Sequence, residues 1–301
     1  MIEVVNIQVR SFDLDFLDIY WDVAPCYESL LDYEFIVQTS DAEFGPYYDL
    51  TVPIVNRFHV RDVTVKGRHS MYHRRYYRVI VRSRLDPTKT ATFPDPNLGG
   101  AKLGAPPDLH ALEMARINNL KLSEFMGRLV WVFPRKQSGQ RCGLCWDRTM
   151  SRKTRSSCPT CFDTTWVGGF HPPVATYAAV ISPVEATAST NVANIQNQDS
   201  TLLAGNYPEL SAGDVVVEAE NVRWRVGQSI TKIRKGRALV RQQAPIHEIC
   251  KGDIEYELPI RLSDEEVRDL VASPERNYTN PQGLTDPALT SALNSVFGKG
   301  R

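Results

Sequence analysis

Two Cys-x-x-Cys pairs constrain the fold of this chain more than any other feature of its sequence. Twelve residues separate the pairs, which are formed by Cys142 with Cys145 and by Cys158 with Cys161. Each pair can turn both of its sulfurs toward one ion, and two pairs complete the tetrahedral set of thiolates that structural zinc prefers. The spacing therefore predicts a Cys₄ zinc ribbon over residues 129–172 that binds one Zn²⁺ ion.

Disulfides within or between the pairs are the main alternative to a metal site. The N-terminal residues Met1-Ile2-Glu3-Val4-Val5 have neither a basic segment nor a long apolar stretch, so we expect no secretory signal. A chain that stays in a reducing compartment rarely forms disulfides, and a redox Cys-x-x-Cys motif rarely occurs as a tandem pair. Metal binding is therefore favoured, and Cys26 and Cys250 are expected to be buried thiols.

The predicted metal would be structural, because four thiolates leave no coordination position for a reacting water. His171 could replace one ligand, but an ordinary loop histidine is the simpler interpretation. The chain also lacks the common hydrolase, zinc-protease, phosphate-loop and dinucleotide-binding motifs. We therefore predict no enzymatic activity, no catalytic residue and no organic cofactor.

Nucleic-acid binding by the cysteine region is the alternative function. Four basic side chains that could contact phosphates lie between the pairs: Arg148, Arg152, Lys153 and Arg155. Three aromatic side chains could stack on bases or form the small core of the module: Trp146, Phe162 and Trp166. Because so short a segment cannot build a large apolar core, we favour zinc as a structural staple that stabilises it.

Composition excludes several other classes of protein. The 301 residues are 42% hydrophobic and carry 35 basic and 35 acidic side chains, which favours two or three globular domains over disorder or a generic polycationic binder. No apolar run is long enough to span a membrane.

Charge is unevenly distributed along this neutral chain. Residues 1–49 contain eleven acids and one base, whereas residues 57–84 and 128–155 are strongly basic, and residues 222–241 hold seven bases and no acid. Facing strands of one domain could neutralise one another, or complementary surfaces could dock onto other copies and neighbouring proteins.

The first 85 residues predict an antiparallel β-sandwich. Residues 17–23, 33–39, 59–65 and 76–82 are rich in β-branched and aromatic residues and contain no helical period. Trp21 on an early strand precedes the late strand Tyr-Tyr-Arg-Val-Ile-Val-Arg. Because a tryptophan on an early strand is followed by this late strand, the segment resembles a fibronectin type III module. The resemblance implies a binding or spacer domain.

A proline-rich linker and one helix are expected over residues 86–128. Residues 86–107 contain five prolines and three glycines, which favour an extended segment that pairs poorly. Asp108 can cap a helix that continues to about Met126. A strand over residues 129–133 would then lead into the cysteines.

The remaining sequence predicts a second β-region and a C-terminal arm. Residues 173–262 contain alternating strands at 177–181, 213–218, 222–226 and 238–241, which favour a small meander or barrel, with a polar loop over 187–206. A capping box at residues 263–266 predicts one short helix within the segment 263–301. From Ser273 onward, spaced apolar residues would form either a strap over a neighbouring subunit or a frayed tail.

The order of these segments resembles that of virion proteins of tailed bacteriophages. The features that carry the resemblance are the fibronectin-like module, the sequence from Gly127 to Arg135, the cysteine pairs, Val167-Gly168-Gly169-Phe170, and a hairpin from Gly213 to Val226 similar to the barrels of head-closure and tail-adaptor proteins. The resemblance implies a structural protein of the neck or collar, between the capsid portal and the tail. We further expect a homo-oligomeric ring that contacts portal, adaptor or tail proteins, with its basic segments facing either packaged DNA or acidic neighbours, synthesis in the host cytoplasm and no membrane contact.

Overall fold

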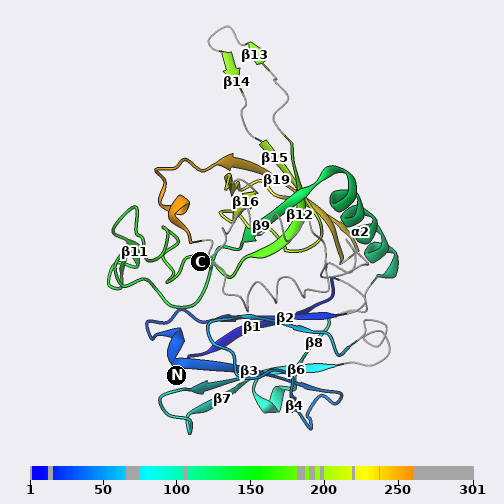
Figure 1. The fold of residues 1–301 in the computed structure, drawn as a ribbon. Helices are drawn as coiled ribbons and strands as arrows, with labels where there is room; N and C mark the ends of the chain where they lie inside the picture. Colours follow the sequence, from blue (N-terminus) through cyan, green and yellow to red (C-terminus); the bar gives the residue numbers. More distant parts are fainter. Residues whose placement is uncertain are drawn as a thin grey trace, which may run out of the picture. The chain divides into compact units, whose positions relative to one another are not determined.

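The chain folds into two compact units, each assembled from two separate stretches of sequence. The computed structural model describes residues 2–12, 16–65, 75–104, 108–181, 187–189, 194–196, 200–218, 221–236 and 238–259. The sandwich unit consists of Met1–Leu112 and Lys136–Gly169, and the barrel unit consists of Glu113–Arg135 and Phe170–Arg301. Both are built mainly from β-strands (Figure 1), which confirms the predicted fold class at this level.

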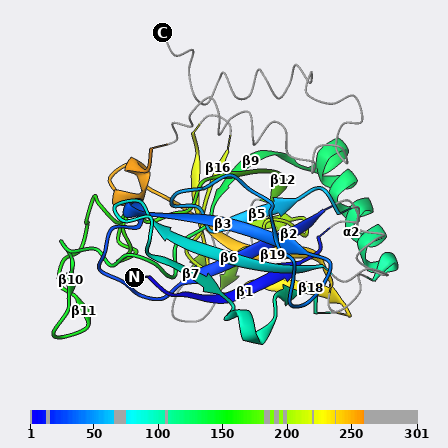
Figure 2. The same ribbon diagram turned by 90° about the horizontal axis from the view of Figure 1, so that it is seen from below.

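Two antiparallel sheets form the framework of the sandwich unit. One sheet has the strand order β1–β2–β5, and the other has the order β4–β3–β6–β7; in Figure 2, β3, β6 and β7 run side by side. The elements are β1 (Val4–Arg10), β2 (Leu17–Val23), η1 (Leu30–Asp32), β3 (Tyr33–Ser40), β4 (Tyr48–Asp49), β5 (His59–Asp62), β6 (Tyr76–Ser83), β7 (Thr90–Phe93) and η2 (Pro96–Leu98). The four strands predicted in this region are thus confirmed as β2, β3, β5 and β6.

Alternating side chains of the two sheets form one hydrophobic core. Successive residues of a strand point to opposite faces, so every second residue of β6 is buried, beginning with Tyr77. Trp21 on β2 packs against the rings of Phe35 and Phe58, with centroid distances of 5.9 and 6.5 Å. The fibronectin resemblance depends on Trp21 and on the late strand that forms β6, and Trp21 and the β6 residue Tyr77 are both part of this core.

The proline-rich stretch does not run unpaired as predicted. Strand β7 pairs with β6, and the short strand β8 (Ala101–Lys102) pairs with the beginning of β6. Pro94 and Pro96 lie outside both strands, so the paired residues keep their N–H groups for the ladder. Phe93, Ala101 and Leu103 pack against the sandwich core, so the sandwich extends beyond residue 85.

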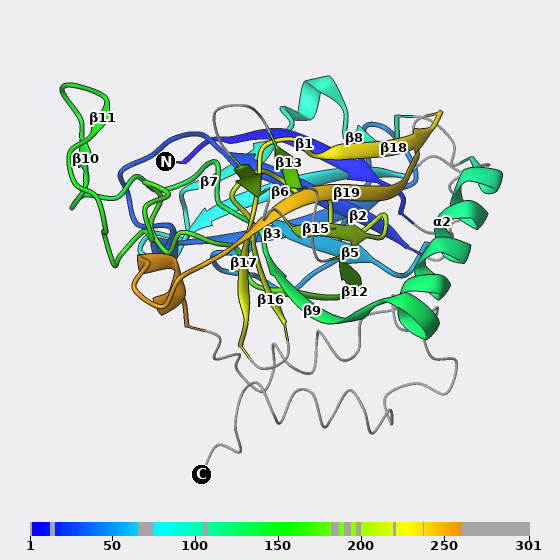
Figure 3. The same cartoon turned by 90° about the horizontal axis from the view of Figure 1, so that it is seen from above.

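Six strands of the barrel unit close into a barrel. Their order is β15–β12–β9–β16–β17–β19, and pairing of β15 with β19 completes the circle, while β18 pairs with β19 outside it (Figure 3). The strands are β9 (Arg128–Phe133), β12 (Val174–Ile181), β15 (Ser200–Ala204), β16 (Val215–Glu218), β17 (Arg223–Val226), β18 (Thr231–Lys235) and β19 (Ala238–Glu248). The unit also contains the hairpin of β13 (Thr187–Ser189) with β14 (Asn194–Gln196), and the turn η4 (Ile254–Glu257).

The barrel differs from the prediction at two strands. Residues 200–204 form β15, not part of a polar loop, because Leu202 and Ala204 alternate into the barrel core. Strand β9 pairs with both β12 and β16 and therefore belongs to the barrel wall. Residues 136–169 are consequently an insertion between two adjacent barrel strands.

The predicted helix is present as α2 (Leu109–Lys121), which continues into one π-helical turn, η3 (Leu122–Met126). The Asp108 carboxylate accepts hydrogen bonds from the N–H groups of His110 and Ala111, which confirms the predicted N-cap. In the part of the chain that the structure describes, no helix is long and apolar enough to cross a membrane. The predicted helix and arm of segment 263–301 lie outside the described residues.

Candidate metal centre

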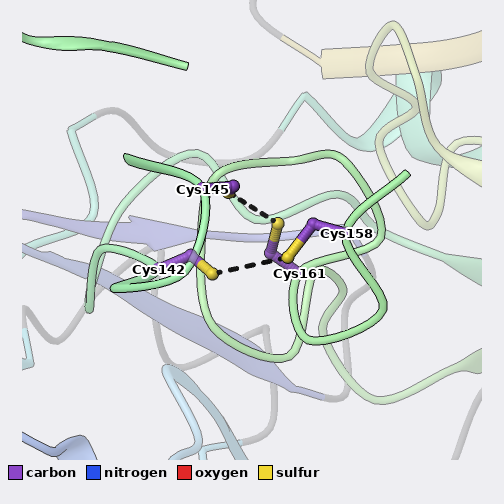
Figure 4. Close-up of side chains that lie close together, drawn as sticks. All are labelled: Cys142, Cys145, Cys158 and Cys161. Carbon is purple, nitrogen blue, oxygen red and sulfur yellow. Dashed lines mark hydrogen bonds between the residues drawn. The ribbon is translucent and has the colours of Figure 1, made fainter. Parts of the chain in front are cut away.

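The four predicted cysteines come together at one buried point. Their Sγ atoms all lie within 4.8 Å of one another. The Sγ atoms of Cys142 and Cys158 are 3.8 Å apart, and those of Cys145 and Cys161 are 3.3 Å apart (Figure 4). Zinc–sulfur bonds of about 2.3 Å in a tetrahedron place the sulfurs roughly 3.8 Å apart, whereas a disulfide requires about 2.05 Å. The four sulfurs are therefore close enough together to hold one metal ion, and none of these cysteines forms a disulfide.

Each cysteine pair is held by backbone hydrogen bonds of the cysteine segment, which we define as residues 136–169. In the first pair, the Cys142 carbonyl accepts from the N–H of Trp146, and the Cys145 carbonyl accepts from the N–H of Thr154. The hairpin of β10 (Trp146–Asp147) with β11 (Arg152–Lys153) connects the pairs. The N–H of Cys142 also donates to the Thr165 carbonyl, so the two pairs are joined through the backbone.

Glycine has different importance at two positions near the cysteines. Gly169 has a φ of +68°, and a Cβ atom there would lie 2.8 Å from the Cys161 carbonyl oxygen, so the position requires glycine. A Cβ on Gly143 would meet nothing within 4 Å. The first pair therefore does not depend sterically on Gly143.

Burial and backbone donors act in opposite directions on these thiols. Burial raises the pKa of Cys161 to about 11 and also raises the pKa of Cys145. For Cys158, burial opposes ionisation, but the Thr160 N–H and other donors outweigh it and lower the pKa. Thiolate is the form that binds a metal, so a cation at this point would displace protons from the buried thiols.

Arg141 is enclosed between two tryptophans beside the cluster. Its guanidinium carbon lies 4.0 Å from the ring centroid of Trp146 and 3.6 Å from that of Trp166. Its Nη1 donates to the Thr165 hydroxyl over 3.0 Å. Because Trp146 follows the first pair and Trp166 the second, this cation–π stack joins the two halves of the segment.

Asp163 stabilises the second pair. Its carboxylate accepts from the N–H of Cys158 at 3.0 Å and forms an ion pair with Lys153 at 3.1 Å. Burial opposes ionisation of Asp163, but the N–H donors and Lys153 outweigh it and lower its pKa. Lys136 is also buried, and its ammonium donates to the Val167 carbonyl at 3.0 Å; burial lowers its pKa.

The cysteine segment is attached to the loop that follows β2. The Cys26 N–H donates to the Gly139 carbonyl, and the Cys26 carbonyl accepts from the N–H of Arg141. The guanidinium of Arg148 lies 4.0 Å from the ring centroid of Tyr27. These contacts explain why residues 136–169 belong to the sandwich unit.

The structure also places the other residues that the sequence singled out. Within the described residues, His171 is not part of the group of candidate metal ligands, so the four cysteines form the set alone. Arg148, Arg152, Lys153 and Arg155 are exposed on the hairpin region. The prediction of two buried extra thiols is wrong, because Cys26 is only partly buried and Cys250, in the turn after β19, is exposed.

Arg141 is the residue at this site that sequence reasoning missed. Its position directly before the first ligand, with a tryptophan after each pair, is the pattern that could have indicated it.

A scan of protein-family models finds no match to this chain, and a search of curated proteins finds no significant relative.

Proposed function

We propose that this protein is a structural subunit of a tailed-phage virion that forms part of the neck or collar joining the capsid portal to the tail. The observation that carries this proposal is the closed barrel, whose β15–β19 pairing leaves no open edge along its six-stranded wall. A small closed barrel is the architecture expected from the resemblance to head-closure and tail-adaptor proteins.

The sandwich supports the same proposal, as a fibronectin type III-like module. Strand β4 joins β3 and the short strand β8 joins β6, so a three-stranded sheet faces a five-stranded one, and the chain crosses between the sheets as in immunoglobulin-like sandwiches. Such a module serves as a spacer or a binding surface, and fold alone assigns it no chemistry.

We further propose that Zn²⁺ is the ion bound by Cys142, Cys145, Cys158 and Cys161, as the structural staple of a zinc ribbon. Four thiolates in a tetrahedral arrangement favour zinc over the harder cations magnesium and calcium. Elemental analysis of protein purified without added metal is expected to find about one zinc per chain. Iron in place of zinc would contradict the choice of metal.

The subunits are proposed to assemble into a ring, with residues 274–301 contributing to the contact. This arm retains spaced apolar residues in a proline-broken sequence, which suits a strap that becomes ordered on docking. Deletion of residues 274–301 is expected to leave a folded protein that neither forms rings nor enters particles. Normal incorporation of the shortened protein into infectious virions would contradict this role.

The neck proposal itself is tested with purified particles of the phage that encodes the chain. Mass spectrometry of intact virions is expected to find the protein in a fixed, low copy number, and imaging is expected to place it between capsid and tail. A protein found in infected cells but missing from virions would overturn the proposal and favour the nucleic-acid-binding alternative.

A further inference from the structure

A buried metal–thiolate centre raises a problem of charge. Four thiolates around a divalent cation carry a net charge of about −2. The four cysteines are at most 4% exposed, so this charge would be largely withdrawn from water. Burying uncompensated charge is costly, and nearby donors or cations must offset that cost.

The cysteine segment contains six basic side chains, but few can fill this role. Arg148, Arg152 and Arg155 are exposed, where water screens their charge. Lys153 already forms an ion pair with Asp163. Two cations remain that are not exposed and form no ion pair within the described residues: Lys136 and Arg141.

Of these two, Arg141 has the closer connection to the ligands. It directly precedes Cys142, and its side chain donates to Thr165. The Thr165 carbonyl accepts from the N–H of Cys142, and the N–H of the neighbouring Thr164 donates to the Cys161 carbonyl. These two adjacent threonines therefore link the guanidinium to one ligand of each pair.

We infer that Arg141 is a positioning residue of the metal centre, which offsets the charge of the bound metal–thiolate group and aligns the two cysteine pairs. The planar guanidinium suits both tasks, since it stacks on Trp146 and Trp166 while its edge donates to Thr165. This inference rests on the proposed metal centre. It assigns a role to a residue outside the ligand set.

The test compares the zinc affinity of the wild-type chain with that of Arg141→Gln and Arg141→Lys, measured by competition with a chromogenic chelator. Arg152→Gln is the matched control, since it removes the same charge from an exposed position of the segment. Loss of a residue that orients and supports metal ligands costs about 10- to 100-fold in affinity. We expect a loss of that size in Arg141→Gln and a change within about twofold in the control.

The lysine variant separates charge from packing, because it retains the positive charge but not the planar stack. We expect Arg141→Lys to recover part of the affinity, and to lower the pH at which half the metal is released relative to Arg141→Gln. Equal affinities for Arg141→Gln and Arg152→Gln would overturn the inference and leave the metal centre intact. If Arg141→Lys recovers neither the zinc affinity nor the lower pH of metal release, the charge-offsetting role of Arg141 is wrong and only its packing matters.

Two further outcomes keep the test decisive. If Arg141→Gln does not fold, Arg141→Lys is compared with Arg152→Lys, and equal affinities again overturn the inference. If wild-type protein binds no zinc or other metal, the proposed metal centre fails, and the role of Arg141 fails with it.

Discussion

The barrel and the cysteine segment differ in what fills their interiors. Buried aliphatic side chains from all six wall strands form the barrel core, including Val132, Leu202 and Ile246. The buried cluster in the cysteine segment consists of four thiols. The barrel is therefore stabilised by burial of apolar surface, which needs no ion. We propose that the cysteine segment depends instead on reduced thiols and on a metal bound by them, so the two regions should respond to different perturbations.

Removal of one metal ligand is expected to have the largest effect, and to affect the cysteine segment alone. Structural zinc contributes about 10–16 kcal/mol of apparent binding free energy at neutral pH. Cys145→Ser is therefore expected to make residues 136–169 susceptible to protease, with cleavage sites mapped by mass spectrometry. Cys250→Ser, which changes an exposed thiol, is the control and should remain resistant. Cleavage spread evenly over the barrel as well would show that the stability of the barrel also depends on the metal ligands.

A cavity in the barrel core is expected to destabilise the barrel and to leave the cysteine segment unchanged. Leu202 is fully buried in the barrel core, and truncation of such a leucine costs about 2–5 kcal/mol. Leu202→Ala should lower the denaturant midpoint of the barrel while the protein retains its metal. Ile181→Ala, at a position that is 43% exposed, should change the midpoint little. Metal loss in Leu202→Ala would show that the two regions are not independent.

The barrel also contains a buried carboxyl group that should make its stability depend on pH. Asp214 accepts hydrogen bonds from the N–H groups of Arg135 and Ser211, but burial raises its pKa from 3.8 to about 6. Between these values the folded state retains a proton that the unfolded state has released. Stability from this group is therefore present below pH 4 and is lost as the pH rises to about 6.

Asp214→Asn isolates this contribution because the amide does not titrate. The free energy of unfolding of wild-type protein minus that of Asp214→Asn should fall by up to about 3 kcal/mol between pH 4 and pH 6. Denaturant titrations at several pH values measure this difference. Parallel profiles for the two proteins would mean that the carboxyl ionises normally in the fold.

The smallest predicted effect concerns the N-cap of α2. Loss of the Asp108 carboxylate should cost about 1 kcal/mol. Hydrogen exchange in Asp108→Ala should accelerate at the amides of His110 and Ala111, which bond to this carboxylate. Glu113→Ala removes an exposed ion pair with Arg116 and should have a smaller effect. Equal acceleration in both variants would contradict the cap.

The sequence predicted the elements whose signal is local. The strands over residues 17–23 and 76–82 were found because β-branched and aromatic residues mark them directly. The cysteine cluster was found because ligand spacing within each pair nearly determines its geometry. Asp108 was found because a cap acts on the next turn of its own helix.

The features that were missed depend on partners distant in sequence. Strand β7 is four residues long in a proline-rich stretch, and only its pairing with β6 makes it a strand. Residues 200–204 belong to a polar stretch of the sequence, and they form strand β15 because they pair with β12 and β19. The attachment of Cys26 to Gly139 joins residues far apart in the chain, which no local pattern reveals.

The central claim is that a bound metal, rather than an apolar core, stabilises the cysteine segment. Its most direct test is limited proteolysis of the wild-type protein before and after metal removal by a chelator under reducing conditions, with metal content measured on the same samples. We predict about one metal ion per chain before treatment, and new cleavage within residues 136–169 after it, reversed when zinc is restored. Metal-free protein that resists cleavage as well as the untreated protein would contradict the claim.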